Sequence, residues 1–113
     1  MATILCVDDD ESITESYSML CGSLRYSVLI ASNGKEGYEL AVSHHPDIII
    51  TDFDMPQMNG FEMYLALQNN PISTNIPLIG SGSFHSEQRA RLPYFLEKGA
   101  SGLGELVQKI LHL

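Results

Sequence analysis

The stretch PDIIITDFDMPQMNG, residues 46–60, joins the most apolar segment of the chain to an acidic turn. Residues 47–51 are dominated by isoleucine, which is typical of a strand buried on both faces of a sheet. Asp52 and Asp54 come directly after this run, and Pro56 is one of the loop-forming residues that follow. The stretch therefore predicts a central strand that ends at a pair of carboxylates.

Outward from this stretch, short apolar runs alternate with longer amphipathic segments. Residues 3–7, 27–31 and 78–81 have the composition of buried strands, and apolar residues recur at helical spacing between them. Strands that alternate with helices imply right-handed βαβ units and a parallel sheet. The pattern therefore predicts an α/β fold of the doubly wound type, with helices on both faces of the sheet.

The C-terminal part of this pattern is compressed. Residues 87–98 are predicted to form a helix that Pro93 interrupts, because proline removes a hydrogen bond from the helical ladder. A fifth strand begins at Gly99 and Ala100 and ends almost at once, since a last helical stripe starts at Leu103. A strand usually takes ~5–6 residues and the loop after it ~2–6 more. We therefore expect the fifth strand and its following loop to be truncated.

Size and charge limit the functions that this chain can have. Of its 113 residues 44% are hydrophobic, so we expect one folded domain over residues 1–113 and no output domain. The formal net charge of −8 argues against direct binding of nucleic acid and favours a cation or a basic protein surface as partner. Neither a membrane-spanning run nor a secretory leader is recognisable, so we expect no membrane contact and a cytoplasmic location.

The two cysteines, Cys6 and Cys21, fit no zinc-binding spacing. Cys6 lies in an apolar run, and Cys21 lies near the end of a predicted helix. We interpret both as small core residues of a protein in a reducing compartment, with a disulfide or a reactive thiol as the alternative.

Acidic side chains gather where two of the predicted strands end. Asp8, Asp9 and Asp10 follow the first strand in the way that Asp52 and Asp54 follow the third. Ligands of a doubly wound sheet bind at the carboxyl ends of its strands. Carboxylates ~4 Å apart repel by about 4 kcal/mol at an effective dielectric of about 20, and a divalent cation such as Mg²⁺ would offset that repulsion. An aspartate in such a site can also be a nucleophile that carries a phosphoryl group.

Each acidic group also has a simpler interpretation. Carboxylates before a helix are favoured by N-capping and by the helix dipole, which would explain Asp8, Asp9 and Asp10 without any ligand. Asp52 could begin an Asx turn before Asp54. The two groups together, at matching ends of neighbouring strands, favour a binding site, while Asp10 is expected to remain a cap or a surface charge.

The motifs at these positions resemble the receiver domains of response regulators in two-component signalling, including the chemotaxis regulators. ILCVDDD, residues 4–10, resembles the first strand of that family and its acidic pair, and residues 46–60 resemble the phosphoacceptor strand with its loop. NGKEG, residues 33–37, and KGAS, residues 98–101, also fit the family. The resemblance implies a flavodoxin-like, five-stranded parallel sheet of order 2-1-3-4-5.

The resemblance also implies a role for each matching residue. Asp52 corresponds to the aspartate that accepts a phosphoryl group from a sensor histidine kinase or a phosphotransfer protein, with Mg²⁺ as cofactor. Asp9 corresponds to the direct metal ligand, Asp8 binds the metal directly or through water, and Asp54 contributes its backbone carbonyl. Such a domain is a signalling phosphoacceptor rather than an enzyme, and it acts on a downstream protein through protein–protein contacts.

Two family positions differ in this chain. The family has a Ser or Thr at the end of strand four that binds the phosphoryl group; counting places Gly82 there, with Ser81 or Ser83 as substitutes. The family also has a Lys after strand five, and no residue of the chain matches it. The alternative function is therefore a degenerate receiver, which serves as a phosphorylation-independent binding module or forms a homodimer.

TDFD, residues 51–54, also resembles the Asp-x-Asp motif of haloacid-dehalogenase-type phosphatases, an enzyme class. In that family the first Asp is the nucleophile and the second is an acid. The motif should then stand near the start of a long domain, whereas here only residues 53–113 follow Asp52. The side chain of Asp54 separates the two ideas, because the phosphatase requires it and the receiver does not.

Overall fold

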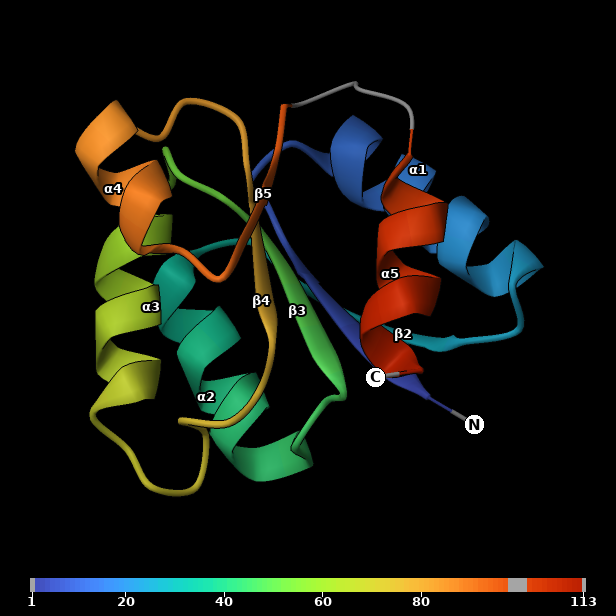
Figure 1. Cartoon of the computed structure of the whole chain (residues 1–113), viewed down its shortest axis with the longest axis horizontal. Coiled ribbons are helices and arrows are strands. Elements are labelled where there is room, and N and C mark those ends of the chain that lie inside the picture. Colours follow the sequence, from blue (N-terminus) through green and yellow to red (C-terminus); the bar gives the residue numbers. More distant parts are fainter. Residues whose placement is uncertain (1, 98–101, 113) are drawn as a thin grey trace.

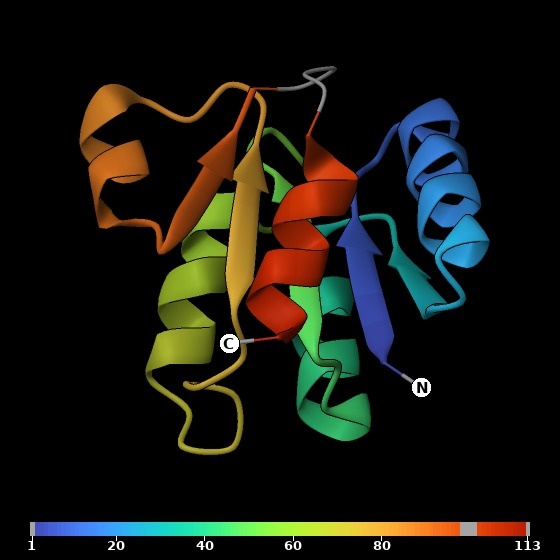
Figure 2. The ribbon, with the colours of Figure 1, turned by 45° about the vertical axis from the view of Figure 1, so that its right-hand side comes forward.

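The computed structural model describes residues 2–97 and 102–112 of the chain. Its five strands form one parallel sheet of order β2-β1-β3-β4-β5, which confirms the predicted α/β, doubly wound fold (Figure 1). The strands are β1 (Thr3–Val7), β2 (Ser27–Ala31), β3 (Ile48–Asp52), β4 (Leu78–Ser81) and β5 (Tyr94–Leu96). All neighbouring strands are parallel, and the arrowheads of β1, β4 and β5 visibly point to the same end of the sheet in Figure 2, so the residues that follow each strand meet at one edge.

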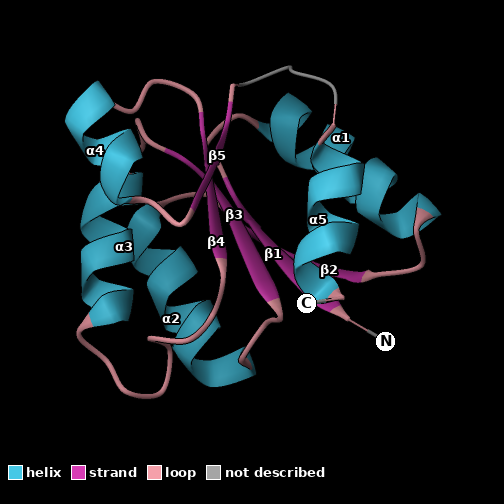
Figure 3. Cartoon of the chain, in the orientation of Figure 1, coloured by secondary structure: helices cyan, strands magenta, loops and turns pink. Residues whose placement is uncertain are grey.

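Helices cover both faces of the sheet (Figure 3). Among the described residues the helices are α1 (Glu11–Ser23), α2 (Gly34–His44), α3 (Gly60–Gln68), α4 (Ser86–Arg91) and α5 (Leu103–Leu111). The first and last of these lie on one face, and the other three lie on the opposite side of the sheet (Figures 1 and 3). No helix in this described part of the chain is long and apolar enough to cross a bilayer.

The core divides into two clusters because alternate residues of a strand point to opposite faces. Ile4 and Cys6 of β1 belong to the cluster beneath α1 and α5, and Leu5 and Val7 belong to the cluster beneath α2 and α3. All four side chains are at most 1% exposed. A central strand covered on both sides must be apolar at every position, which explains the continuous hydrophobic runs in the sequence.

Polar side chains fix where the first three helices begin. Asp10 is the N-cap of α1 and accepts a hydrogen bond from the backbone N–H of Ser12 at 2.9 Å, as the sequence predicts. Asn33 caps α2 in the same way, and Asn59 forms a capping box with Glu62 at the start of α3. Each cap lies just after the carboxyl end of a strand or its loop, so it also orients the chain at that edge.

The predicted helix over residues 87–98 is wrong, because α4 ends at Arg91. Proline disfavours the helical conformation of the residue before it, and Leu92, which precedes Pro93, has an extended ψ of 144°. The chain then forms β5, which pairs with β4 in parallel. The fifth strand is short, as expected, but it lies before Gly99 and Ala100, and those two residues are outside the described part of the chain. Both α4, with six residues, and β5, with three, are therefore short.

Side-chain packing explains why β5 forms at this place. The buried side chain of Leu92 lies over Gly80 of β4, where a Cβ atom would clash with it. The Phe95 ring meets the Phe84 ring edge to face at 6.2 Å between centroids, and the guanidinium of Arg89 lies 5.2 Å from the centroid of Phe95. These contacts stabilise an extended chain after Pro93.

Both cysteines are free thiols in the core cluster beneath α1 and α5, as predicted. Cys6 and Cys21 are at most 1% exposed. A hydrogen bond to Cys21, together with burial, raises the pKa of the Cys6 thiol, whereas the hydrogen bond from Cys6 lowers the pKa of Cys21. The structure has no disulfide between Cys6 and Cys21, which was the alternative interpretation.

Candidate functional site

The carboxyl ends of β1 and β3 bring three carboxylates together. Val7 pairs with Thr51, so the next residues on the two adjacent strands are Asp8 and Asp52. One carboxylate oxygen from each of Asp8, Asp9 and Asp52 lies within 4.8 Å of the other two. Asp8 and Asp52 are buried and Asp9 is exposed. Three of the four residues predicted as metal ligands thus converge at one point.

Two hydrogen bonds with backbone groups hold Asp8 in this position. The Asp8 N–H donates to the carbonyl of Ala31 at 3.1 Å, which continues the pairing of β1 with β2 by one residue. One oxygen of Asp8 accepts a hydrogen bond from the N–H of Asp10 at 3.0 Å. This contact turns the chain into α1, where Asp10 serves as the cap. Asp10 therefore has the structural role that the sequence indicates, and it is not one of the three converging carboxylates.

The three carboxylates fit a magnesium ion. Their oxygens are hard donors, which Mg²⁺ prefers over nitrogen or sulfur ligands. Two of the three groups are buried, so their mutual repulsion is poorly screened and a bound cation would relieve it. The third group, Asp9, faces solvent, and that side of the site can supply the waters that Mg²⁺ usually retains.

The loop after β3 is tied closely to the end of that strand. Gly60 donates its N–H to the carbonyl of Phe53 at 2.8 Å, and a Cβ atom at Gly60 would clash with the carbonyl oxygen of Asp52. Met58 accepts a hydrogen bond from the N–H of Gly34 at 3.0 Å, which fastens the same loop to the start of α2. Asp54 lies in this loop with an exposed side chain, and its carboxylate is not part of the cluster of three. A contribution of its backbone carbonyl to a metal stays a prediction.

A hydroxyl group lies on the other side of Asp52. Ser81, the last residue of β4, pairs with Asp52 in the register of the two strands and is 4% exposed. Gly82, which counting along the sequence placed at this point, has a left-handed φ of 102° and no side chain to offer. Ser83 is exposed. Of the three candidate residues, Ser81 is therefore the one whose hydroxyl is buried beside the aspartate.

Tyr17 contacts Ser81, and the sequence did not predict this contact. Its hydroxyl lies 3.2 Å from the Ser81 hydroxyl oxygen and reaches the edge of the sheet from α1. In the sequence Tyr17 is one of several apolar residues at helical spacing, and spacing alone does not indicate where its hydroxyl points. The informative feature is a polar atom on a residue that stands among apolar residues at helical spacing, since such an atom needs a partner when it is buried.

Because β5 ends earlier in the chain than predicted, a different set of residues follows it. The strand ends at Leu96, so Lys98 comes two positions later in the chain, whereas the predicted strand began after Lys98. Lys98 itself, like the rest of the KGAS motif at residues 98–101, lies outside the described residues. With β5 at this place Lys98 becomes a candidate for the family's lysine, while the expectation that no residue of the chain matches that lysine stays a prediction.

Comparison with protein families and curated proteins gives a consistent result. The family model described as the response regulator receiver domain matches residues 4–103. The nitrate/nitrite response regulator protein NarL of Escherichia coli (strain K12) is 36% identical over 103 residues, which are 89% of this chain and 46% of NarL. The cell cycle response regulator CtrA of Brucella abortus (strain 2308) is 32% identical over 88 residues, which are 78% of this chain and 38% of CtrA. The chain thus spans half or less of the length of these relatives.

Solved structures with the same fold include several receiver domains. The chemotaxis protein CheY4 of Vibrio cholerae is 27% identical with a TM-score of 0.85, over 97% of this chain and 98% of that chain. The N-terminal domain of a protein from Wolinella succinogenes is 28% identical with a TM-score of 0.88, over 99% and 95%. The receiver domain of a signal transduction histidine kinase from Syntrophus aciditrophicus, at 24% identity, 99% and 91% coverage and a TM-score of 0.89, supports the fold alone.

Proposed function

Because the chain belongs to the response regulator receiver domain family, we propose that Asp52 accepts a phosphoryl group from a sensor histidine kinase or a phosphotransfer protein. The observation that carries this proposal is the position of Asp52. It ends β3 as one of three clustered carboxylates, and Ser81 is its partner in the register of the neighbouring strand. Both features are what a phosphoacceptor aspartate needs, namely a cation-binding side and a hydrogen-bond donor.

Each residue of the site has a part in this transfer. An oxygen of Asp52 attacks the phosphorus atom of a phosphohistidine, so a P–O bond forms while the P–N bond breaks and the histidine ring leaves with the electron pair. Asp8 and Asp9 would hold Mg²⁺ together with Asp52 and the Asp54 carbonyl. The ion supplies positive charge that offsets the charge of the phosphoryl group. Ser81 donates its O–H to a phosphoryl oxygen.

The output of this chemistry is signalling rather than turnover. We propose that the domain is a phosphoacceptor, not an enzyme acting on a separate substrate, and that it passes its state to a downstream protein by contact. The net charge of −8 favours a basic protein surface and disfavours direct binding to nucleic acid. The cytoplasmic location expected from the sequence stays a prediction.

A second candidate function is a degenerate receiver that acts as a phosphorylation-independent binding or dimerisation module. The edge of the sheet favours it, because β5 has three residues that are all only half-buried and α4 has six residues, none of them buried. An edge strand with so little cover can pair with another chain. The two candidates differ in whether Asp52 reacts.

Intact-mass spectrometry after incubation with acetyl phosphate and Mg²⁺ separates these candidates. We expect one phosphoryl adduct on the wild-type chain, none on Asp52→Asn, and an undiminished adduct on Asp54→Asn. The last variant is a matched control, because Asp54 lies two residues away with an exposed side chain. It also tests the phosphatase alternative, in which that side chain is required. If the wild type forms no adduct and binds no Mg²⁺, the degenerate receiver is the better description.

A further inference from the structure

The hydrogen bond between Tyr17 and Ser81 joins α1 to the end of β4. The two hydroxyl oxygens are 3.2 Å apart and belong to residues separated by 64 positions in the chain. Ser81 is 4% exposed, so its hydroxyl has little access to water and depends on protein partners. Tyr17 is a half-buried residue that packs against the core cluster beneath α1 and α5.

The strand register places Ser81 next to the aspartate, on the side of the sheet that α1 covers. Ile50 and Ile79 belong to the core cluster beneath α1 and α5, and each comes two residues before Asp52 and Ser81 respectively. Because side chains two residues apart in a strand share a face, Asp52 and Ser81 point to the same side of the sheet as Tyr17. Ser81 thus has Asp52 as its partner in the strand register and Tyr17 as its hydrogen-bond partner, all on one side of the sheet.

The two neighbours of Ser81 matter because a serine hydroxyl can both donate and accept a hydrogen bond. Ser81 has one proton to donate and can accept through its oxygen. A phosphoryl group on Asp52 is a charged acceptor and takes the stronger hydrogen bond, so the Ser81 proton turns toward it. The Ser81 oxygen is then left to accept, and the Tyr17 hydroxyl is the donor within reach. A hydrogen bond donated to the Ser81 oxygen also strengthens the hydrogen bond that Ser81 donates to the phosphoryl group.

We propose that Tyr17 is a positioning residue of the phosphoryl site, whose hydroxyl donates to Ser81 and thereby directs the Ser81 proton at the phosphoryl group on Asp52. This inference rests on the proposed function of Asp52 and adds a residue from α1 to its site.

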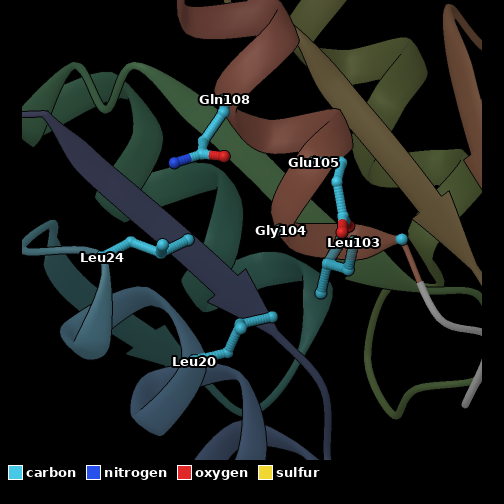
Figure 4. Close-up of a pocket in the computed structure, with 7 residues that line it drawn as sticks. Leu20, Leu24, Leu103, Gly104, Glu105 and Gln108 are labelled. Atoms are coloured by element: carbon cyan, nitrogen blue, oxygen red, sulfur yellow. The ribbon is translucent and has the colours of Figure 1, made fainter.

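The surroundings of Tyr17 leave room for this adjustment. A cavity of about 180 Å³ is lined by Tyr17 and Ser81, and it shares Leu20 and Leu103 with a groove between α1 and α5. In Figure 4, Leu20 from α1 and Leu103 from α5 line that groove. The phenol ring is therefore not locked by packing on every side, and its hydroxyl can follow the serine when the phosphoryl group arrives.

A double-mutant cycle tests the inference on the intact chain. The measurement is the initial rate of adduct formation on Asp52 with acetyl phosphate and saturating Mg²⁺. Tyr17→Phe removes the hydroxyl and keeps the ring, and we expect roughly a 3–10-fold lower rate, which is the worth of one hydrogen bond. Ser81→Ala should slow the reaction further, and Tyr17→Phe should then have no additional effect, because its partner is gone. In a Ser81→Thr chain, which keeps a hydroxyl, the effect of Tyr17→Phe should return.

Tyr38→Phe is the matched control for this cycle. The Tyr38 hydroxyl accepts a hydrogen bond from Asn70 at 3.0 Å and belongs to α2, on the other face of the sheet, so its loss should leave the rate unchanged. An equal loss of rate from Tyr17→Phe with and without Ser81 would show a general structural effect and overturn the inference. An unchanged rate in Tyr17→Phe would also overturn it while leaving the proposed function intact. No adduct on the wild-type chain would overturn both.

Discussion

The backbone of Gly60 lies directly against the carbonyl group of Asp52 and leaves no space there for a Cβ atom. The N–H of Gly60 also donates to the carbonyl of the next residue, Phe53, at 2.8 Å. The first residue of α3 is thus packed onto the end of β3. A side chain at position 60 would have to displace backbone, which is much harder to move than the tip of a flexible side chain.

Gly60→Ala should therefore destabilise the fold and disturb the site together. We expect the free energy of unfolding in urea to fall by about 1–3 kcal/mol, the usual cost of overpacking, and the adduct on Asp52 to form more slowly. Gly22→Ala is the control, because a Cβ at this exposed position of α1 meets nothing within 4 Å. It should stabilise the chain by roughly 0.5–1 kcal/mol through helix propensity. Equal urea midpoints for Gly60→Ala and wild type would contradict the prediction.

Asp9→Asn should abolish the response of the chain to Mg²⁺. The wild-type melting temperature is expected to rise when Mg²⁺ replaces EDTA, because an ion that binds the native state alone stabilises it. Asp9→Asn removes one of the three converging carboxylates, so that rise should disappear. In EDTA the same variant should melt no lower than wild type, since one source of repulsion is gone. Asp54→Asn should respond as wild type does, and a full response of Asp9→Asn would exclude it as a ligand.

Much of this site could be predicted because it depends on strand ends. Apolar runs locate β1 and β3, and in a parallel sheet their carboxyl ends meet at one edge, so Asp8, Asp9 and Asp52 were expected to converge. The serine at the end of β4 was harder to assign. A shift of one residue exchanges Ser81 for Gly82, and only the pairing with β3 determines which of them stands beside Asp52.

The structure of the segment around Pro93 could not be predicted, because the local sequence pattern and the tertiary packing favour different structures there. Residues 87–98 have helical character, and a helix broken at Pro93 is one outcome of that pattern. The other is an extended strand after the proline, and it is favoured by contacts of Leu92 and Phe95 with Gly80 and Phe84. Those contacts join distant positions of the chain, so the spacing of apolar residues contains no sign of them.

The two buried thiols should differ in reactivity. The pKa of Cys6 is raised by its hydrogen bond to Cys21 and by burial, and the pKa of Cys21 is lowered by the same hydrogen bond. Since the thiolate is the reactive form, iodoacetamide at pH 8 should modify Cys21 of the native chain before Cys6, slowly because both are buried. Peptide mapping by mass spectrometry gives the order. In urea the two rates should become equal, whereas Cys6 reacting first in the native chain would contradict the assignment.

Lys98 should be required for rapid phosphorylation of Asp52. It is the first lysine after β5 in the sequence, and a cation after that strand would pair with phosphoryl oxygens by a charge-assisted hydrogen bond. We expect Lys98→Ala to lower the initial rate of adduct formation about tenfold or more, which corresponds to ~1.5–3 kcal/mol for a hydrogen bond to a charged group. Lys109→Ala, on α5, is the control of equal charge change and should keep the wild-type rate. Equal rates of adduct formation for Lys98→Ala, Lys109→Ala and wild type would show that Lys98 takes no part in the phosphorylation of Asp52.

Pro93→Ala should weaken β5 by restoring the competing helix. Proline ends α4 because it cannot donate a backbone hydrogen bond and because it keeps Leu92 extended. With alanine the helix can continue beyond Arg91, at the expense of pairing between β5 and β4. We expect faster amide hydrogen exchange at residues 94–96 and a loss of about 0.4–1 kcal/mol in the free energy of unfolding. Pro71→Ala, in the connector before β4, should cost a similar amount of chain entropy without changing exchange in β5. If exchange in β5 is the same in Pro93→Ala and wild type, packing of Leu92 and Phe95 alone fixes the strand.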